Sequence, residues 1–255
     1  MDKRYAVLIG IDDNDIKGCS NDVEDIRSML ETIYHIPSRN IITITREKQN
    51  ESLLEMKSDV SMHEQIKNSI AVLLEIARRE DIVHVWFHVS SHGKQIAYKR
   101  SSIFKIEEGK YISSKWITRE LSKLPKSCDI LMTFDYCHSG YYHQLPYMYE
   151  MHPRGMLRRT IKVDNGNNTN EIHPRMFCIA STSNGYSSDV LYEEADGFRG
   201  AFTKALLDGL KHHRYKVELP TLFDTIQKIM RIRNHEQQPR LFSSSMDPYE
   251  YFILT

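Results

Sequence analysis

The sequence predicts an α/β domain built on a largely parallel sheet, and two observations carry this prediction. Short apolar or β-branched segments alternate with amphipathic helical segments along the chain, a pattern typical of strands joined by helical crossovers. Residues 130–134 are apolar except for Thr133, as expected of a central parallel strand covered on both faces. A chain of 255 residues is long enough for one large domain of this kind.

Each predicted element has a local reason. Two helices are expected to open with capping boxes, which begin at Asn21 and at Ser61. A third helix is expected to end before Pro125, since proline lacks the N–H that a helix interior needs. A fourth is expected to begin at Pro220, because proline is tolerated in the first turn. The predicted helices span residues 21–34, 62–77, 116–124, 198–212 and 220–233. The predicted strands are apolar or β-branched runs at residues 4–9, 41–45, 82–89, 130–134, 176–180 and 249–254.

The composition excludes several classes of protein. Lys and Arg together number 34, as do Asp and Glu, so a surface that is basic throughout and binds nucleic acid is not expected. The longest apolar runs fall well short of the roughly 18 residues of a membrane span. Four cysteines without a CxxC pair do not form a disulfide framework. These features favour a reducing, cytoplasmic setting.

Residues 147–174 interrupt the alternation of strands and helices. They include an Asn-rich run, Asp164–Asn170, whose composition is typical of loops. We therefore expect an exposed linker here, within a single domain that spans residues 1–255. The linker would divide a first part, residues 1–146, from a second part, residues 175–255.

Two of the predicted strands end in reactive residues. The strand at 82–89 runs into Ser90-Ser91-His92-Gly93, and the strand at 130–134 runs into Asp135-Tyr136-Cys137-His138-Ser139-Gly140. The carboxyl ends of neighbouring parallel strands meet at one edge of a sheet, so His92 and Cys137 are expected to lie together. A thiol and an imidazole are the minimal nucleophile and acid–base pair for acyl transfer. The backbone N–H groups of Gly93 and Cys137 are candidates for the oxyanion hole.

Five segments in order resemble the sequence boxes of metacaspases, which are caspase-like cysteine endopeptidases. The resemblance covers most of the chain and implies a caspase-like fold, with a central, mostly parallel β-sheet flanked by helices on both faces. It also implies a monomer in which Cys137 is the nucleophile and His92 the general acid–base. The five segments are Tyr5–Gly10 with Gly18–Val23, Ser90–Gly93, Asp135–Gly140, Gly200–Thr203 and Gln238–Ser245.

The resemblance further implies a pocket for P1, the residue before the cleaved bond. Asp22 and Asp135 would form its floor, with Cys19 and Ser90 beside them. Two carboxylates accept a guanidinium or an ammonium, so protein or peptide substrates with Arg or Lys at P1 are expected. The same carboxylates would repel the P1 Asp that caspases proper prefer. From its position alone, Asp22 is better explained as an acid in the first turn of a helix, which the helix dipole favours, and it is the resemblance that implies a role in the pocket.

Three departures from the metacaspase pattern bear on activity. Ser91 replaces a glycine, which is expected to stiffen or crowd the loop that carries His92, and Tyr136 replaces a small residue, which is expected to enlarge one wall of the pocket. Calcium-dependent metacaspases carry an acidic stretch after the histidine box, yet residues 94–110 hold five Lys or Arg against Glu107 and Glu108. Ca²⁺ takes roughly 6–8 oxygen ligands, so we expect the usual calcium site to be missing, no other metal site, and activity that is calcium-independent or very low.

Alternatives remain open at this stage. A pseudoenzyme that keeps the fold and binds basic peptides or partner proteins would have the same acidic pocket. The basic residues Arg158, Arg159 and Lys162 fit a solvated loop, a self-processing site or a nucleic-acid contact. The spacing of His84, His88 and His92 would place the three side chains on one face of a strand, which suggests a zinc site, but no zinc motif accompanies them. Since Met1 nearly adjoins the first strand, no Pro- or Gln-rich N-terminal prodomain is expected.

Overall fold

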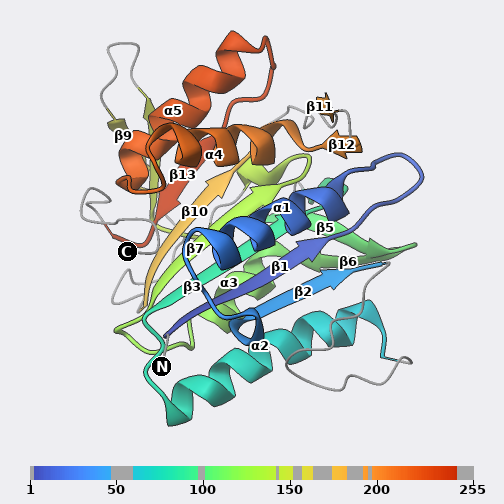
Figure 1. The fold of residues 1–255 in the computed structure, drawn as a ribbon, viewed down its shortest axis with the longest axis vertical. Coiled ribbons are helices and arrows are strands. Elements are labelled where there is room, and N and C mark those ends of the chain that lie inside the picture. Colours follow the sequence, from blue (N-terminus) through green and yellow to red (C-terminus); the bar gives the residue numbers. More distant parts are fainter. Residues whose placement is uncertain are drawn as a thin grey trace.

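An eight-stranded sheet forms the centre of the molecule (Figure 1), in the order β2-β1-β3-β7-β10-β13-β8-β9. The computed structural model describes residues 3–46, 60–96, 101–141, 144–151, 157–162, 174–182, 192–194 and 197–245. From β2 to β10 neighbouring strands are parallel, and from β10 to β9 they are antiparallel. The predicted fold class is therefore confirmed. The strands are β1 (Arg4–Gly10), β2 (Ile41–Thr45), β3 (His84–Ser90), β7 (Asp129–Asp135), β8 (Tyr147–Met151), β9 (Leu157–Lys162), β10 (Arg175–Ala180) and β13 (Arg240–Ser243).

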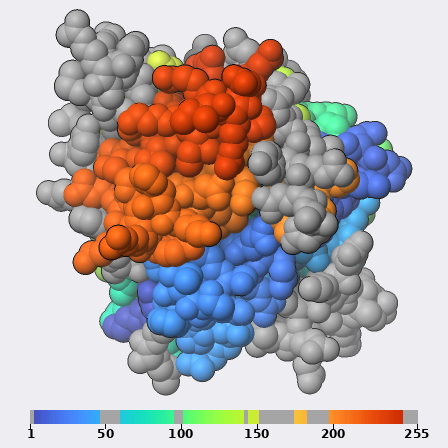
Figure 2. Space-filling model, turned by 45° about the horizontal axis from the view of Figure 1, so that its top comes forward, coloured from blue at the N-terminus to red at the C-terminus, as the bar shows by residue number. Residues whose placement is uncertain are grey.

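Helices cover both faces of the sheet. One face carries α1 (Cys19–Thr32), α4 (Ala201–His212) and α5 (Leu219–Ile232), and the other carries α2 (Met62–Arg79) and α3 (Ser114–Leu121). Figure 2 shows α1, in blue, adjoining α4, in orange, with α5, in orange-red, on the far side of α4. Successive side chains of a strand point to opposite faces, so Leu8 lies in one apolar core while Val7 and Ile9 lie in the other. Within the described residues, no helix has the length and apolar character that crossing a bilayer requires.

Two small sheets lie after the His92 loop and before α4, and the sequence did not predict them. The first contains β4 (Gly93–Ile96), β5 (Ser101–Glu107) and β6 (Lys110–Ser113), and the second is the hairpin of β11 (Tyr192–Glu194) and β12 (Gly197–Arg199). Within β5, Phe104 and Ile106 are buried while Lys105 between them is partly exposed. This alternation is the strand signal, and the high charge of residues 94–110 obscured it. Two 3₁₀ turns, Ser38–Asn40 and Ser139–Tyr141, complete the described elements.

The capping box predicted at Asn21 is wrong. Helix α1 begins two residues earlier, and the carboxylate of Asp12 accepts hydrogen bonds from the backbone nitrogens of Cys19 at 2.9 Å and Ser20 at 3.1 Å. Asn21 instead donates through Nδ2 to the Phe198 carbonyl, 3.1 Å away. A carboxylate from a preceding loop satisfies the same free N–H groups as a local cap, so the helix needs no cap of its own. The N-cap at Ser61 is confirmed, with Oγ accepting from the backbone nitrogen of residue 64 at 3.3 Å, while the Glu64 carboxylate pairs with Lys67.

The expected exposed linker is also wrong in part. Residues 147–151 and 157–162 form the β8–β9 hairpin, and β8 pairs with β13. Met148 and Tyr149 are buried, because β8 contributes to the cores on both faces. Residues 163–173, which include the whole Asn-rich run, lie outside the described residues, as does the strand predicted at 249–254.

Candidate active site

His92 and Cys137 follow two hydrogen-bonded parallel strands at the same end. The register of β3 and β7 sets Ser90 beside Asp135, and each reactive residue lies two positions further on. A Cβ atom on Gly93 would lie 2.2 Å from the Cys137 carbonyl oxygen and 2.9 Å from the Cys137 nitrogen. The two loops therefore touch backbone to backbone, which only glycine allows here. The side chains of His92 and Cys137 are both partly exposed.

A network of hydroxyl groups fixes the loop that carries Cys137. His138 has φ 61°, a left-handed conformation that a non-glycine residue adopts only when its surroundings hold it there. The next residue, Ser139, is buried, and its Oγ lies 3.2 Å from Ser181 Oγ and accepts from the Thr182 nitrogen at 3.3 Å. These contacts attach the nucleophile loop to the end of β10.

The His92 ring meets a carboxylate that the sequence reasoning missed. Its Nδ1 lies 3.5 Å from Asp13 Oδ2, and the Asp13 side chain is only 5% exposed. Lys105 Nζ lies 3.2 Å from the same oxygen, and the Lys105 backbone nitrogen donates to the His92 carbonyl at 2.7 Å. The sequence signal for Asp13 was that it follows the end of the first strand, whereas the pairing of Gly10 with Ser90, which brings that strand end to His92, appears only in the structure.

The two predicted pocket carboxylates lie together beside the first turn of α4. Asp22 accepts hydrogen bonds from Ser90 Oγ at 2.7 Å and from the Gly200 nitrogen at 2.8 Å. Asp135 accepts from Thr203 through its backbone nitrogen at 3.0 Å and its Oγ1 at 2.8 Å. A Cβ on Gly200 would lie 2.3 Å from Asp135 Oδ2 and 2.8 Å from Asp22 Oδ2. Glycine at position 200 thus lets both carboxylates approach the N-terminus of a helix, where negative charge is favoured.

Burial changes the protonation of this pair. It raises the pKa of Asp135 to about 6. The pKa of Asp22 is raised well above its ordinary value, first by burial and then by the charge of Asp135. Two carboxylates this close do not both ionise readily, so the pair favours a form that keeps one proton. Burial also raises the pKa of the adjacent Cys19 thiol, which therefore stays protonated.

A small cavity of about 10 Å³ opens between these groups, roughly the space of one water molecule. The structure brings all four predicted pocket residues to its wall. Its lining is Ile16, Lys17, Cys19, Asp22, Ser90, Ser91, Asp135 and Gly200.

A family model described as "Caspase domain" matches residues 3–250. The chain belongs to the caspase domain family. Metacaspase-1 of Candida albicans is 27% identical over 176 residues, covering 61% of this chain and 37% of that protein. Metacaspase-1 of Schizosaccharomyces pombe is 25% identical over 171 residues, covering 61% and 38%. The chain spans a little over a third of the length of these curated relatives.

Solved structures share the fold of this caspase domain at low sequence identity. A protein of Geobacter sulfurreducens superposes with a TM-score of 0.60 and 17% identity, covering 97% of this chain and 96% of that one. The Drosophila initiator caspase Dronc superposes with a TM-score of 0.54 and 8% identity, covering 93% and 78%. At such identities the likeness is one of fold alone, and it confirms the predicted architecture.

Two departures from the metacaspase pattern are accommodated inside this caspase domain. Ser91 is buried, and its Oγ donates to the Lys105 carbonyl at 2.6 Å, which ties the His92 loop to β5. The expectation that Tyr136 forms a pocket wall is wrong. Its ring is fully buried and its hydroxyl lies 3.0 Å from Ser102 Oγ, so it packs beneath β5 and does not line the acidic cavity.

The described part of this caspase domain does not fit a calcium ion. The carboxylates near β5 already bind ammonium groups, since Lys105 Nζ lies 2.8 Å from Glu108 and 3.2 Å from Asp13. Among the residues that the structure describes, one group could offer three metal ligands within 4.8 Å of one another, namely Asp13, Asp15 and His92. Two carboxylates and an imidazole fall short of the roughly 6–8 oxygen ligands that Ca²⁺ takes.

The other histidines of β3 are buried in the sheet. His88 is fully buried with Nδ1 2.8 Å from Thr133 Oγ1, and burial lowers its pKa to about 3. His84 is also buried, with Nδ1 4.0 Å from an oxygen of Asp129. Neither joins a group of three metal ligands among the described residues.

The basic residues of the expected linker are not brought to the dyad. Arg158, Arg159 and Lys162 belong to β9, which is four strands from β7 in the sheet order. At about 4.8 Å per strand this amounts to roughly 19 Å. A peptidase binds an unpaired extended segment, so a cut at these residues requires β9 to leave β8 first.

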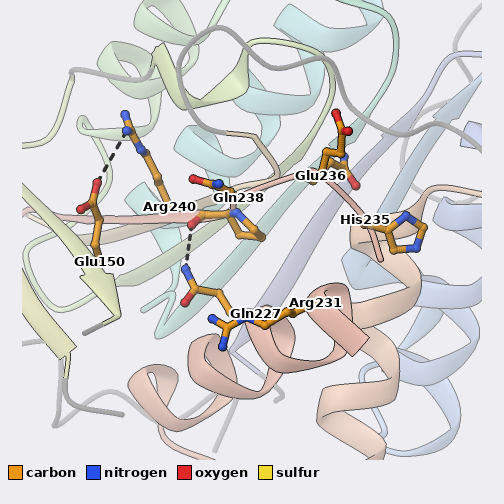
Figure 3. A pocket seen from close by; sticks show the side chains of 9 residues that line it. Glu150, Gln227, Arg231, His235, Glu236, Gln238 and Arg240 are labelled. Atoms are coloured by element: carbon orange, nitrogen blue, oxygen red, sulfur yellow. Dashed lines mark hydrogen bonds and ion pairs between the residues drawn. The ribbon is translucent and has the colours of Figure 1, made fainter. Parts of the chain in front are cut away.

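A larger hollow of about 440 Å³ lies between α5, β8 and the segment before β13 (Figure 3). Gln227 Nε2 donates to the Pro239 carbonyl at 3.0 Å, and Arg240 pairs with Glu150 at 3.6 Å. The cations and anions of its lining balance, so it favours no single class of ligand. Its lining is Glu150, Gln227, Arg231 and residues 235–240.

Proposed function

We propose that this caspase domain is a cysteine endopeptidase that cleaves peptide bonds after Arg or Lys. One observation carries the proposal. Two pairs of side chains lie at one edge of the sheet. One is the partly exposed pair of His92 and Cys137, and the other is the buried carboxylate pair of Asp22 and Asp135. Cys137 is two residues beyond Asp135, the last residue of β7, so a P1 side chain bound by the carboxylates would bring the P1 carbonyl to the thiol.

The proposed reaction uses His92 and Cys137 as a dyad. The Cys137 thiolate attacks the carbonyl carbon of the P1 residue, and the carbonyl oxygen takes the negative charge. The backbone N–H groups of Gly93 and Cys137 are the proposed donors to that oxyanion. The His92 imidazolium gives its proton to the leaving amine as the C–N bond breaks. Water, activated by His92, then hydrolyses the thioester and restores the thiol.

The acidic pair supports selection of a basic P1 side chain. A guanidinium or ammonium between Asp22 and Asp135 would replace the proton that the pair retains, with charge-assisted hydrogen bonds to both carboxylates. An Asp side chain would add a third carboxylate to a buried site, which costs free energy without a cation. Because the cavity holds about 10 Å³, a P1 side chain must displace its walls, among them the exposed Lys17.

Independence from calcium and a monomeric state are also part of the proposal. The ammonium of Lys105 already neutralises Asp13 and Glu108 beside the His92 loop, which supports activity in the absence of calcium. The β8–β9 hairpin covers the edge of β13, so β13 is not open to pair with a second copy.

A binding protein without turnover is the second candidate. The observation that favours it is the small size of the acidic cavity, which does not admit an Arg side chain without rearrangement. Such a protein would bind basic peptides through the same carboxylates and leave them uncut.

The deciding experiment measures hydrolysis of a fluorogenic peptide with Arg at P1 by the reduced protein, in calcium and in chelator. Cys137→Ala is the control for contaminating peptidases, and matched peptides with citrulline or Asp at P1 test the pocket. Turnover that needs Cys137, ignores chelator and prefers Arg supports the proposal. Binding of the Arg peptide without turnover would establish the second candidate, and faster cleavage of the Asp peptide would refute the pocket assignment.

A further inference from the structure

The loop that follows β1 brings a fixed carboxylate to the His92 ring. Asp13 Oδ2 lies 3.5 Å from His92 Nδ1. We propose that Asp13 is a positioning residue for His92, holding the ring through Nδ1–H so that Nε2 is free to exchange protons with Cys137 and the substrate. The inference rests on the proposed peptidase function, and it extends the dyad to a triad whose third member comes from a different strand end.

The Asp13 carboxylate is held in place by its own loop. Oδ1 accepts hydrogen bonds from the backbone nitrogens of Asp15 at 2.9 Å and Ile16 at 2.8 Å. With 5% of the side chain exposed, these bonds fix the carboxylate so that Oδ2 faces the His92 ring and the Lys105 ammonium. Burial opposes ionisation, but the hydrogen bonds from Ile16, Lys105 and Asp15 outweigh it and hold the pKa of Asp13 below its ordinary value. The group that faces the imidazole is therefore an anion at neutral pH.

His92 needs such a partner. Its Nδ1 is shielded from solvent and makes no hydrogen bond with any residue that the structure describes. An imidazole nitrogen that is shielded from water and makes no hydrogen bond costs free energy, because its lost hydration is not replaced. At 3.5 Å the contact with Asp13 is longer than the 2.7–3.2 Å of a formed hydrogen bond. Catalytic hydrogen bonds are often long in free enzymes and shorten when substrate binds, so we expect this contact to shorten in the complex.

Lys105 limits how strongly the charge of Asp13 stabilises the His92 imidazolium. Its Nζ lies 3.2 Å from the same Oδ2 and 2.8 Å from Glu108, so part of the Asp13 charge is compensated. A bare carboxylate would stabilise the imidazolium more and make His92 a weaker acid toward the leaving amine. Among the described residues, the charged or titratable groups around His92 are Asp13 and Asp15 from the loop after β1, Lys105 of β5, which pairs with Asp13 and Glu108, and Cys137 from the loop after β7.

The test compares kcat and KM of the whole protein carrying Asp13→Asn or Asp13→Glu with the wild type. An Asn keeps an oxygen for the Asp15 and Ile16 nitrogens and places an amide donor where Oδ2 faced Nδ1, which opposes the required tautomer. We expect Asp13→Asn to lower kcat by about 10–100-fold with KM within about 2-fold, and Asp13→Glu to restore part of kcat. A serine-protease triad loses about 10⁴ for the same exchange, but its contact is shorter.

The pH profile separates positioning from a structural role. Without the Asp13 carboxylate the imidazolium is less stable, so the alkaline limb of kcat moves to lower pH in Asp13→Asn. Lys105→Met removes the compensating charge and moves the limb to higher pH. A change in folding stability alone would move neither limb. The matched control is Asp15→Asn, which removes an equal charge from an exposed side chain of the same loop and leaves kcat within about 3-fold.

Two outcomes overturn the inference. One is wild-type kcat in Asp13→Asn, or a change confined to KM. The other is a matching loss of activity in Asp15→Asn and in chelator, which would assign the three residues to a metal. Should the wild type not turn over, the proposed function fails by itself. The inference is then judged by ¹⁵N NMR of His92, with Nδ1 protonated in wild type and Nε2 protonated in Asp13→Asn, and identical spectra overturn it.

Discussion

Asp135 accepts two hydrogen bonds from Thr203, one from the backbone nitrogen at 3.0 Å and one from the hydroxyl at 2.8 Å. Thr203 is the third residue of α4, so the side chain proposed to bind a P1 cation also caps a helix. The carboxylate that caps the helix is therefore the same one to which we assign specificity. Substitutions at position 135 can separate the two roles, because a neutral amide still accepts hydrogen bonds whereas a methyl group does not.

We expect Asp135→Asn to lower kcat/KM for an Arg-P1 peptide by about 10–100-fold, the equivalent of about 1.5–3 kcal/mol for one charge-assisted hydrogen bond. Its unfolding free energy should stay close to that of the wild type, since the Asn oxygen can still accept from Thr203. Asp135→Ala should lose the same activity and also about 1 kcal/mol of stability, the usual cost of a lost cap. Urea unfolding and steady-state kinetics of the two variants test this, and equal stability losses would contradict the division of roles.

Gly200→Ala should abolish recognition of a basic P1 residue. The added Cβ would lie 2.3 Å from Asp135 Oδ2 and 2.8 Å from Asp22 Oδ2, so both carboxylates must move and the Asp22 bond to the Gly200 nitrogen is strained. We expect a loss of at least about 100-fold in kcat/KM for Arg-P1 peptides, a cost of about 2.7 kcal/mol. The control is Gly209→Ala in the same helix, where the tightest contact is a flexible Leu222 methyl at 3.1 Å. Equal effects of the two variants would refute the explanation.

The positions of the reactive residues at the strand ends could be predicted from the sequence, because the signals for a strand and its end lie in neighbouring residues. An apolar run followed by a polar box marks the end of a buried strand, and Ser90 and Asp135 are indeed paired across β3 and β7. The partnership of Asp13 with His92 could not be found in the same way. It depends on Gly10 pairing with Ser90, a register between strands that are distant in sequence.

Two further misses have the same physical origin. The cap of α1 comes from Asp12, seven residues before the first N–H that it accepts, and local capping patterns do not reach so far. The β8–β9 hairpin was predicted as part of an exposed linker because the Asn-rich run follows it, yet pairing with β13 and burial of Met148 make it part of the sheet. In each case a tertiary contact outweighed the local preference.

Binding of a basic P1 residue should depend on pH through the acidic pair. Burial sets the pKa of Asp135 at about 6, so below pH 6 this carboxyl is protonated and a guanidinium loses a charged partner. We expect the ratio of kcat/KM for Arg to that for citrulline at P1 to fall by about tenfold per pH unit below 6. The ratio cancels the titration of the dyad, which affects both peptides alike. A ratio that stays flat from pH 7 to pH 5 would show that the pair does not titrate on binding.

Acid should destabilise the fold through His88. The pKa of this buried imidazole is about 3 in the folded chain against 6.5 ordinarily, so below pH 6.5 the unfolded state binds a proton that the folded state does not. Folding stability is therefore lost by about 1.4 kcal/mol for each pH unit between 6.5 and 3. Asp135 acts in the opposite direction, because its raised pKa favours the folded state as the pH falls from 6 to about 4.

His88→Asn isolates this contribution, since the amide can still meet Thr133 without taking up a proton. Relative to wild type, we expect the variant to gain about 1.4 kcal/mol of unfolding free energy per pH unit from pH 6.5 to pH 4. The measurement is urea unfolding of both proteins across that range. His35→Asn is the matched control, because His35 is exposed and its φ of 54° suits asparagine. A constant difference between His88→Asn and wild type at every pH would mean that the buried ring does not resist protonation.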